Sequence, residues 1–486
     1  MPISRRDVLR GAAAVAATAS LPALAACGPS PTPIDPTGPT TSAEPVLGLR
    51  FPGGFGWGAS TSAYQIEGAA AEDGRAPSIW DTFSHTPGKV AGGDTGDVAA
   101  DHYHRYPEDL DLMKRLGLTS YRFSVSWPRV VPAGTGPVNQ RGLDFYKRLV
   151  DGLRERAIAP VVTLFHWDLP QALQDRGGWV NRDCAGWFAD YADVMYRALG
   201  DAVPVWLTLN EPKTVVDVGY RYGAHAPGLR DDDQAYVAAH HLLLAHGRAV
   251  QALRATGSKA RIGPALNLAP AYPDPDGDAA ATAAARLADG YENRLYLDPV
   301  FKGTYPADVL DDLGRDAPMR AAIRDGDLAT ISSKVDLLAV QYYNPVFVAA
   351  NGRYVTRLPT SDATWQQLYP DGLYDTLTRL RRDYGDVPIT ITENGRPSAD
   401  EPDGDGRIED PERIAFLRDH LAAAHRAIAD GVRLESYHLW SLLDNFEWAE
   451  GYRQRWGIVY VDYPTQRRIE KSSAHWYREV IARNGI

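Results

Sequence analysis

The chain has 486 residues, of which 44% are hydrophobic and 23% are charged, and its net charge at pH 7 is −11. This size and composition are typical of a globular protein with room for one large domain or several small ones. The negative charge, without any basic stretch interleaved with aromatic residues, argues against nucleic acid as a partner.

Residues 1–26 are predicted to be an export signal. Arg5, Arg6 and Arg10 come before an Ala-rich apolar run that is too short and too weakly hydrophobic for a membrane span. The motif SRRDVLR, which contains these arginines, resembles a twin-arginine signal. A signal of that kind implies that the protein is exported after it has folded.

Cys27 and the residues that follow it indicate how the exported protein is held. LAAC at 24–27 resembles a lipoprotein signal-peptidase box, in which Cys27 would carry the lipid. We expect this lipid anchor to be the only attachment of the protein to a membrane. Cleavage after ALA at 23–25, which would leave a secreted protein, is the alternative. The segment 27–46 is rich in Pro, Thr, Ser and Gly and buries too little apolar surface to fold. We therefore expect an extended tether ahead of a folded domain over 47–486.

Eight strand-like runs recur along this domain. Most are continuous apolar runs rather than alternating ones, which is typical of parallel strands covered on both faces. The runs lie at 55–60, 120–125, 159–167, 203–211, 260–268, 335–343, 387–395 and 434–444. Helical patterns separate them, among them 107–117, 139–157 and 411–431. This order predicts an α/β fold, a single (β/α)8 TIM barrel with long loops. A doubly wound open sheet is the alternative, although no glycine-rich nucleotide loop follows the first strand.

Two of the predicted strands deliver a glutamate at their C-terminal ends. VPVWLTLNE ends at Glu211, and Glu393 follows the apolar run VPITIT. A carboxylate in such a place is costly unless it is paired, hydrogen-bonded or open to a cleft. Barrel enzymes gather their active sites at the C-terminal ends of the strands. We therefore expect both carboxylates, on strands four and seven, at one mouth.

The residue pair around Glu211 requires a local distortion. Pro212 biases Glu211 toward an extended backbone and marks the end of the strand. Strand alternation would direct Asn210 away from Glu211. If both side chains serve one cleft, the strand must depart from regular geometry at its end.

Six longer motifs resemble those of family 1 of the glycoside hydrolases, the β-glucosidase family. They are FGWGASTSAYQIEGA, YRFSVSWPRV, TLFHWDLPQAL, TLNEP, ITENG and WSLLDNFEWAEGY. The resemblance runs from about Phe51 to the C-terminus. It implies a retaining exo-β-glycosidase that removes terminal β-D-glucosyl or related residues from glycosides and short oligosaccharides through a covalent glycosyl-enzyme. The implied partner is a small carbohydrate, and no metal or other cofactor is needed.

The same resemblance implies roles for individual residues. Glu211 would be the acid/base and Glu393 the nucleophile, so that Glu211 must be protonated and Glu393 ionised at the working pH. Arg122 and Tyr343 would support the ionised nucleophile. The residues implied for sugar binding are Gln65, His166, Asn210, Tyr343, Trp440, Glu447 and Trp448. Amides, carboxylates and indoles suit the polar edges and apolar faces of a sugar ring.

Each of these residues also has a purely structural interpretation. Taken alone, His166 is more often a satisfied core histidine and Trp440 a core aromatic residue. Glu447 alone could be a solvated loop charge. The functional interpretation depends on their forming one constellation at the barrel ends.

Two positions depart from the family pattern. Gln341 stands where asparagine is common, which affects a contact near the leaving-group side. Trp456 stands where phenylalanine is usual near the 6-position of the sugar. The preferred glycon is therefore open among glucose, galactose, fucose and xylose, and the aglycon contacts variable loops.

Two other functions compete with the leading one. A phospho-glycosidase of the same fold would bind a 6-phosphate, but Glu447 would repel that phosphate and an export signal does not suit an intracellular enzyme. A surface sugar-binding protein could keep the fold and lose turnover, but Glu211 and Glu393 are both intact.

Acidic loops and cysteines give no metal motif. The stretches 273–278 and 400–407 are rich in Asp and Gly, but neither forms a twelve-residue calcium loop, and we interpret both as solvated loops. The two cysteines offer neither a disulfide framework nor a zinc motif. Cys184 lies in a helix-like pattern and is expected to be a small buried hydrophobic residue.

Overall fold

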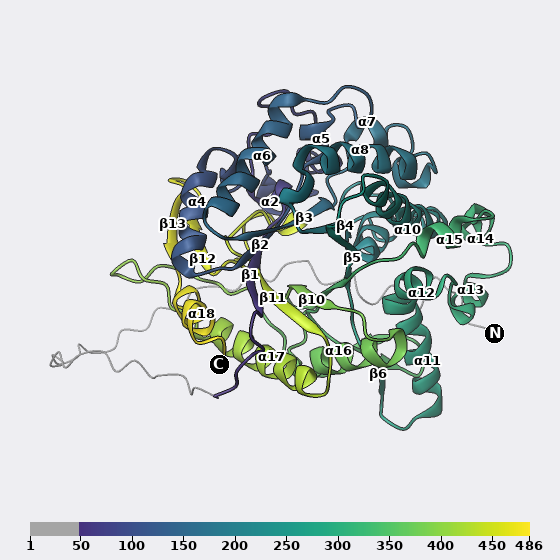
Figure 1. Cartoon of the computed structure of the whole chain (residues 1–486). Coiled ribbons are helices and arrows are strands. Elements are labelled where there is room, and N and C mark those ends of the chain that lie inside the picture. The colour runs from purple at the N-terminus through teal and green to yellow at the C-terminus, as the bar shows by residue number, and fades with distance from the viewer. Residues whose placement is uncertain (1–47) are drawn as a thin grey trace.

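The computed structural model describes residues 48–486, and eight parallel strands close into a barrel at its centre (Figure 1). Neighbouring strands follow the order β1-β11-β10-β7-β5-β4-β3-β2. The barrel strands are β1 Gly56–Ser60, β2 Ser120–Ser124, β3 Ala159–Phe165, β4 Val205–Asn210, β5 Arg261–Asn267, β7 Leu338–Gln341, β10 Ile389–Glu393 and β11 Leu434–Trp440. Each of the eight expected runs contains one of these strands. The predicted (β/α)8 barrel is therefore confirmed, and the closure of β1 on β11 excludes a doubly wound open sheet.

Helices surround the barrel (Figure 1). They are α2 Ala63–Ile66, α3 Ile79–Ser84, α4 His102–Leu116, α5 Trp127–Val130, α6 Gln140–Glu155, α7 Gln171–Gln174, α8 Cys184–Leu199, α9 Pro212–Thr214, α10 Asp232–Ala255, α11 Ala279–Asp289, α12 Leu295–Lys302, α13 Ala307–Leu313, α14 Pro318–Ala322, α15 Asp327–Ile331, α16 Pro370–Tyr384, α17 Pro411–Ala429 and α18 Ser472–Arg483. The long helices bury apolar side chains on one face. In α6, for example, Leu149 and Leu153 are buried one turn apart. No helix within 48–486 is long and apolar enough to cross a membrane.

Shorter helical turns lie in the connections. Four are 3-10 turns, namely η1 Ala91–Gly93, η2 Gly178–Val180, η3 Gly200–Ala202 and η6 Trp448–Glu450. Two are π-helical, namely η4 Val215–Arg221 and η5 Gly290–Arg294. Cys184 begins α8 and is a buried free thiol, as expected.

Helix α4 begins before the predicted start at Pro107. An additional turn from His102 precedes the proline. His102 Nδ1 lies 2.7 Å from Asp109 Oδ2 in the next turns, and both side chains are buried. This contact stabilises the helical turn before Pro107, where the proline in the sequence had indicated the start of the helix.

Two small sheets were not expected from the sequence. One contains β6 Ala271–Asp274, β8 Val346–Ala349 and β9 Tyr354–Val355, and the other is the hairpin of β12 Val459–Asp462 and β13 Arg467–Glu470. These strands have two to four residues. The residues of β6, β9 and β13 are only partly buried or exposed, so these strands lack the continuous apolar run that marks a barrel strand.

The loop at 400–407 is not uniformly solvated, because Asp400 is buried. It accepts hydrogen bonds from Lys471 Nζ (2.6 Å) and Arg413 Nη2 (2.7 Å). Lys471 also donates to Asp444 (2.8 Å), which accepts from Arg455 as well (2.8 Å). The interpretation of this loop as solvated is therefore wrong at Asp400, whose cationic partners offset the cost of burial.

The two ends of the described chain meet at one end of the barrel. Leu49 and Ile486 exchange backbone hydrogen bonds of 2.9 and 3.0 Å. His425 Nε2, near the end of α17, lies 3.0 Å from the carbonyl oxygen of Arg50. Because α17 ends shortly before β11 begins, these contacts lie at the N-terminal ends of the strands. Residues 1–47, with the predicted signal, Cys27 and the whole predicted tether, lie outside the described part.

The buried cluster around Lys471 generates a stability prediction. Lys471→Met should lower the free energy of unfolding by about 3 kcal/mol, because it leaves buried carboxylates short of one cation. The control Lys147→Met removes an exposed lysine 3.5 Å from Asp144 and should cost less than about 1 kcal/mol. Urea unfolding of both variants measures the difference, and equal losses would contradict the structural role of Lys471.

Candidate active site

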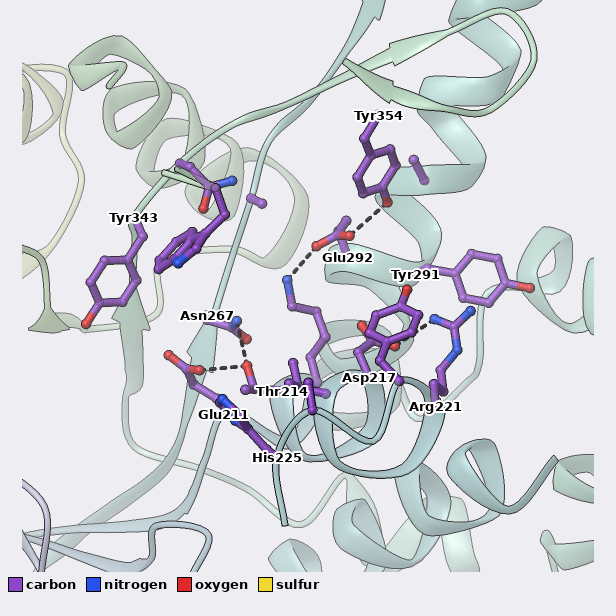
Figure 2. A pocket seen from close by; sticks show the side chains of 18 of the residues that line it. Glu211, Thr214, Asp217, Arg221, His225, Asn267, Tyr291, Glu292, Tyr343 and Tyr354 are labelled. Atoms are coloured by element: carbon purple, nitrogen blue, oxygen red, sulfur yellow. Dashed lines mark hydrogen bonds and ion pairs between the residues drawn. The ribbon is translucent and has the colours of Figure 1, made fainter. Parts of the chain in front are cut away.

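A pocket of about 1210 Å³ opens at the C-terminal ends of the barrel strands. Glu211 follows β4, Glu393 ends β10, and Tyr343 lies just after β7; all three line the pocket. Its wall extends past α9 and η4 toward η5 and β9 (Figure 2). The volume exceeds the ~300–1,000 Å³ typical of a single small-molecule site.

The backbone at Glu211 has a left-handed conformation. Its φ and ψ are 43° and 65°, so the expectation of an extended backbone before Pro212 is wrong. Proline disfavours the right-handed helical region for the preceding residue, and here that residue takes the left-handed one. The pairing of β4 with β5 also shifts register between Leu207 and Asn210. This is the distortion that the neighbouring Asn210 and Glu211 require to serve one site.

Glu393 is buried and receives hydrogen bonds at both carboxylate oxygens. Arg122 Nη1 and Gln341 Nε2 donate to Oε1, the latter over 2.7 Å, and the Tyr343 hydroxyl donates to Oε2 over 2.7 Å. Burial raises the pKa of Glu393, while Arg122 and Tyr343 oppose that rise. These three hydrogen-bond donors, one of them the Arg122 cation, favour the ionised form of this carboxyl.

Arg122 connects Glu393 to the rest of the site. Its guanidinium is fully buried and also donates to Thr163 Oγ1 (2.8 Å) and Asn210 Oδ1 (2.6 Å). Asn210 Nδ2 donates in turn to His166 Nε2 (3.0 Å). Side chains from β3 and β4 thus hold the guanidinium of β2 that pairs with the strand-end carboxylate of Glu393.

Glu211 differs from Glu393 in its surroundings. Burial and the negative charge of Glu393 raise the pKa of Glu211 to about 8. The Thr214 hydroxyl donates to Glu211 Oε2 over 2.7 Å and, with the cation of Lys213, limits the rise. At neutral pH the site therefore holds its proton on Glu211 in preference to Glu393.

The other expected sugar-binding residues lie in two layers. His166, Tyr343, Trp440, Glu447 and Trp448 line the pocket. Gln65 and Asn210 are not among the lining residues and lie behind them. Gln65 Nε2 donates to Asn445 Oδ1 (2.9 Å) and lies 3.5 Å from Glu447 Oε2, and Asn210 bonds to His166 as described.

Aromatic rings form one wall of the pocket. Trp440 and Trp448 each stack with His166 at 5.9 Å between ring centroids, and both indoles are buried. Just beyond Glu393, a Cβ on Gly395 would lie 1.9 Å from the Trp440 carbonyl oxygen, so this close approach requires glycine. The wall therefore packs directly against the backbone that follows Glu393, where Trp440 N–H donates to the Asn394 carbonyl oxygen over 3.0 Å.

Glu447 also lines the pocket, beside Trp448. Burial and then the negative charges of Glu393, Glu450 and Glu211 raise the pKa of Glu447 to about 8. A freely solvated loop charge would not show this shift.

Gln341 and Trp456 take positions that the sequence described only in part. Gln341 donates to Glu393 and to Asn210 Oδ1 (2.6 Å), so its contact lies beside Glu393 rather than on the leaving-group side. Trp456 contacts Tyr343 edge to face (5.6 Å) and stacks with Trp365 (6.2 Å). Trp365 is 54% exposed at the pocket and has no periodic pattern around it that could have revealed it.

Charged groups beside Glu211 were also missed by the sequence analysis. Lys213 is ion-paired with Glu292, which accepts a further hydrogen bond from the Tyr354 hydroxyl (2.8 Å). Arg221 pairs with Asp217 (2.7 Å) farther along the wall (Figure 2). Glu292 lies 79 positions from Lys213 and 62 positions from Tyr354, and local sequence patterns carry no signal for contacts at such separations. Within 48–486, no group of three or more His, Cys, Asp or Glu side chains is placed to hold a metal ion.

Comparison with known proteins gives two family matches. The model for "Glycosyl hydrolase family 1" matches residues 48–486, and that for the "TAT (twin-arginine translocation) pathway signal sequence" matches residues 2–22.

Individual proteins match over almost their whole length. Beta-glucosidase A of Acetivibrio thermocellus is 49% identical, over 90% of this chain and 99% of the relative. A 1,4-beta-D-glucan glucohydrolase of Thermotoga neapolitana is 45% identical, over 90% and 99% respectively. The solved structure of a β-glucosidase from Thermotoga maritima in complex with glucoimidazole is 46% identical, with a TM-score of 0.87 over 90% of this chain and 100% of that one.

The arrangement of the two glutamates generates a prediction about proton affinity. Glu393→Gln removes a negative charge that raises the pKa of Glu211, so the Glu211 carboxyl should titrate below about 8. Carbon-13 NMR of labelled carboxyls measures this shift, with Glu211→Gln identifying the signal. Glu412→Gln, at an exposed site, is the control and should leave the titration unchanged. If Glu393→Gln also leaves it unchanged, burial alone sets the proton affinity of Glu211.

Proposed function

Because the chain belongs to glycosyl hydrolase family 1, we propose that Glu211 and Glu393 are the two carboxyls with which it cleaves β-glycosides. The protein is a retaining exo-β-glycosidase of the β-glucosidase type, which removes terminal β-D-glucosyl or related residues. One observation carries the assignment of roles. Two buried carboxyls line one pocket, and one is held by a guanidinium while the other has a pKa raised to about 8.

The first chemical step follows from these environments. Glu393 attacks the anomeric carbon as the bond to the leaving oxygen breaks, and Glu211 donates its proton to that oxygen. The product is a covalent glycosyl ester of Glu393. Arg122 and Tyr343 stabilise the carboxylate before attack, and Tyr343 reaches the carboxylate oxygen that Arg122 does not.

The second step reverses the roles of proton donor and acceptor. Esterification removes the negative charge of Glu393, which is one of the two causes that raise the pKa of Glu211. Glu211 is then ionised and suited to accept a proton from water. That water attacks the anomeric carbon, the ester bond breaks, and the sugar leaves with its original configuration.

We assign the sugar to the strand-end wall of the pocket. His166, Glu447 and Trp448 line this wall and offer polar groups to hydroxyls, while Gln65 and Asn210 stand close behind. Trp440 provides an apolar face for stacking. Tyr343 donates to Glu393 and contacts Trp456 edge to face.

For the natural substrate, we favour glucosides and short β-1,4-glucan fragments, as in cellulose breakdown. The names of the relatives support this choice, and the exposed ring of Trp365 offers a stacking surface beyond the sugar wall. A 6-phosphorylated sugar is disfavoured, because the ionised carboxylate of Glu393 would repel a phosphate, and Glu447, whose pKa is raised to about 8, offers the phosphate no positive charge.

The chain carries a twin-arginine signal sequence, which suggests export. For display we propose that Cys27 bears a lipid and that residues 27–46 tether the domain to the membrane surface. The LAAC box supports this anchoring. Cleavage within the preceding alanines, with release of the enzyme, is the competing outcome.

The roles of the two glutamates are tested by the stereochemistry of azide rescue. Glu393→Gly should leave space for azide at the anomeric carbon, and a single displacement should give the α-glycosyl azide. Glu211→Ala should still form the glycosyl-enzyme from dinitrophenyl glycosides, whose leaving group needs no proton, and azide should then give the β product. Proton NMR of the products distinguishes the anomers.

Two results would contradict the assignment. Swapped anomers would exchange the roles of Glu211 and Glu393. A wild-type protein that binds sugars without turning over activated glycosides would favour a sugar-binding function instead.

Membrane attachment is tested by Cys27→Ala in the full chain. The wild-type protein should sediment with membranes, and the variant should be released or mis-processed, because a single acyl chain already binds bilayers with about 10⁴ M⁻¹ and further chains bind more firmly. Cys184→Ala is the matched control, since it removes the other cysteine, which is buried within the barrel domain. Equal solubility of the wild type and Cys27→Ala would support simple secretion.

A further inference from the structure

Glu211 is held by a chain of two hydrogen bonds on the side away from Tyr343. The Thr214 hydroxyl donates to Glu211 Oε2 (2.7 Å), and Asn267 Nδ2 donates to Thr214 Oγ1 (3.1 Å). Helix α9 begins directly after Glu211 and ends at Thr214, and Asn267 is the last residue of the neighbouring strand β5. Figure 2 shows the two hydrogen bonds meeting at Thr214, with the second carboxyl oxygen of Glu211 directed toward Tyr343.

In this arrangement the hydroxyl hydrogen of Thr214 can point only toward Glu211. A hydroxyl has a single hydrogen to donate and accepts through its oxygen. Asn267 occupies an acceptor site of the Thr214 oxygen, and the Thr214 hydrogen lies on Glu211 Oε2. Oε2 is therefore the accepting oxygen of the carboxyl in both of its protonation states.

We propose that Asn267 and Thr214 form a positioning relay that keeps the transferable proton of Glu211 on Oε1, the oxygen that faces the reacting sugar. The inference rests on the acid/base role proposed for Glu211. Neither relay residue donates the proton itself. Thr214 and Asn267 act only by fixing which oxygen of Glu211 carries it.

The relay also favours release of the proton at the moment of bond cleavage. Hydrogen bonds to an ionised acceptor are stronger than those to a neutral one, so the bond from Thr214 strengthens as Glu211 becomes a carboxylate. In the resting site this bond lowers the pKa of Glu211, against the opposing effects of burial and Glu393.

Other charged groups near Glu211 also shift its pKa. The negative charge of Glu393 on β10 raises the pKa of Glu211, and Lys213 on α9 and Arg122 on β2 lower it. Tyr343 and Glu447 face the same carboxyl across the pocket. These groups are unchanged in a Thr214 variant, so a change in proton affinity there reports the hydrogen bond alone.

Thr214→Val and Thr214→Ser test the relay, because valine keeps the shape of threonine without the hydroxyl and serine keeps the hydroxyl. With Thr214→Val we expect kcat/KM to fall about ten-fold for phenyl β-glucoside, whose departure needs a proton, and less than about two-fold for 2,4-dinitrophenyl β-glucoside. The basic limb of the kcat/KM profile should move to higher pH, because the lost bond lowered the pKa of Glu211. Thr214→Ser should restore the wild-type pH profile and leaving-group dependence.

Asn267→Ala provides a second variant that leaves Thr214 in place. Without its donor, the threonine hydroxyl is free to rotate, and we expect the same pattern as in Thr214→Val with a smaller loss. If Thr214→Val is poorly folded, this variant carries the test.

The possible results separate the relay from the proposed function. Equal losses on both glucosides, or Val and Ser variants that behave alike, would overturn the relay and indicate packing alone. If the relay is overturned in this way while the wild-type protein still hydrolyses the glucosides, the proposed function is unaffected. Loss of all turnover in the wild type would overturn the proposed function together with the inference.

Discussion

The site depends on one buried guanidinium placed among buried carboxyls. Arg122 has no solvent-exposed side-chain surface, and it donates to Glu393, Asn210 and Thr163. An unpaired ion at this depth would be strongly unfavourable, so the ends of β2, β3, β4 and β10 must meet within hydrogen-bonding distance. Closure of the barrel supplies that convergence. The same pairing stabilises the ionised state of Glu393 and leaves the nearby Glu211 without a comparable cation.

The charge difference between the two glutamates therefore originates in the fold rather than in the glutamates themselves. Both residues lie at the C-terminal ends of apolar strands, Glu393 as the last residue of β10 and Glu211 directly after β4, and both are buried. One meets Arg122, Gln341 and Tyr343, whereas Glu211 meets the neutral hydroxyl of Thr214 and a lysine that is already paired with Glu292. Low polarity amplifies these unequal surroundings into unequal proton affinities.

The sequence was most informative where a residue type is compatible with only a few structural environments. Long apolar runs identified all eight barrel strands, and the cost of a carboxylate at a strand end located Glu211 and Glu393 at one mouth. It was least informative where several conformations were open. The left-handed backbone of Glu211 contradicts the extended preference of a residue before proline. Burial of Asp400 depends on Lys471, 71 residues away. Similarly, Lys213 pairs with Glu292, 79 residues away, and Thr214 accepts from Asn267, 53 residues away.

The pairing of Leu49 with Ile486 determines how the barrel is presented to its surroundings. The described chain enters at the N-terminal ends of the strands, and the pocket opens at the opposite ends. Any attachment upstream of residue 48 is thus joined to the floor of the barrel. The mouth of the pocket therefore lies on the opposite side of the barrel from any such attachment, which leaves the approach of a substrate unobstructed by it.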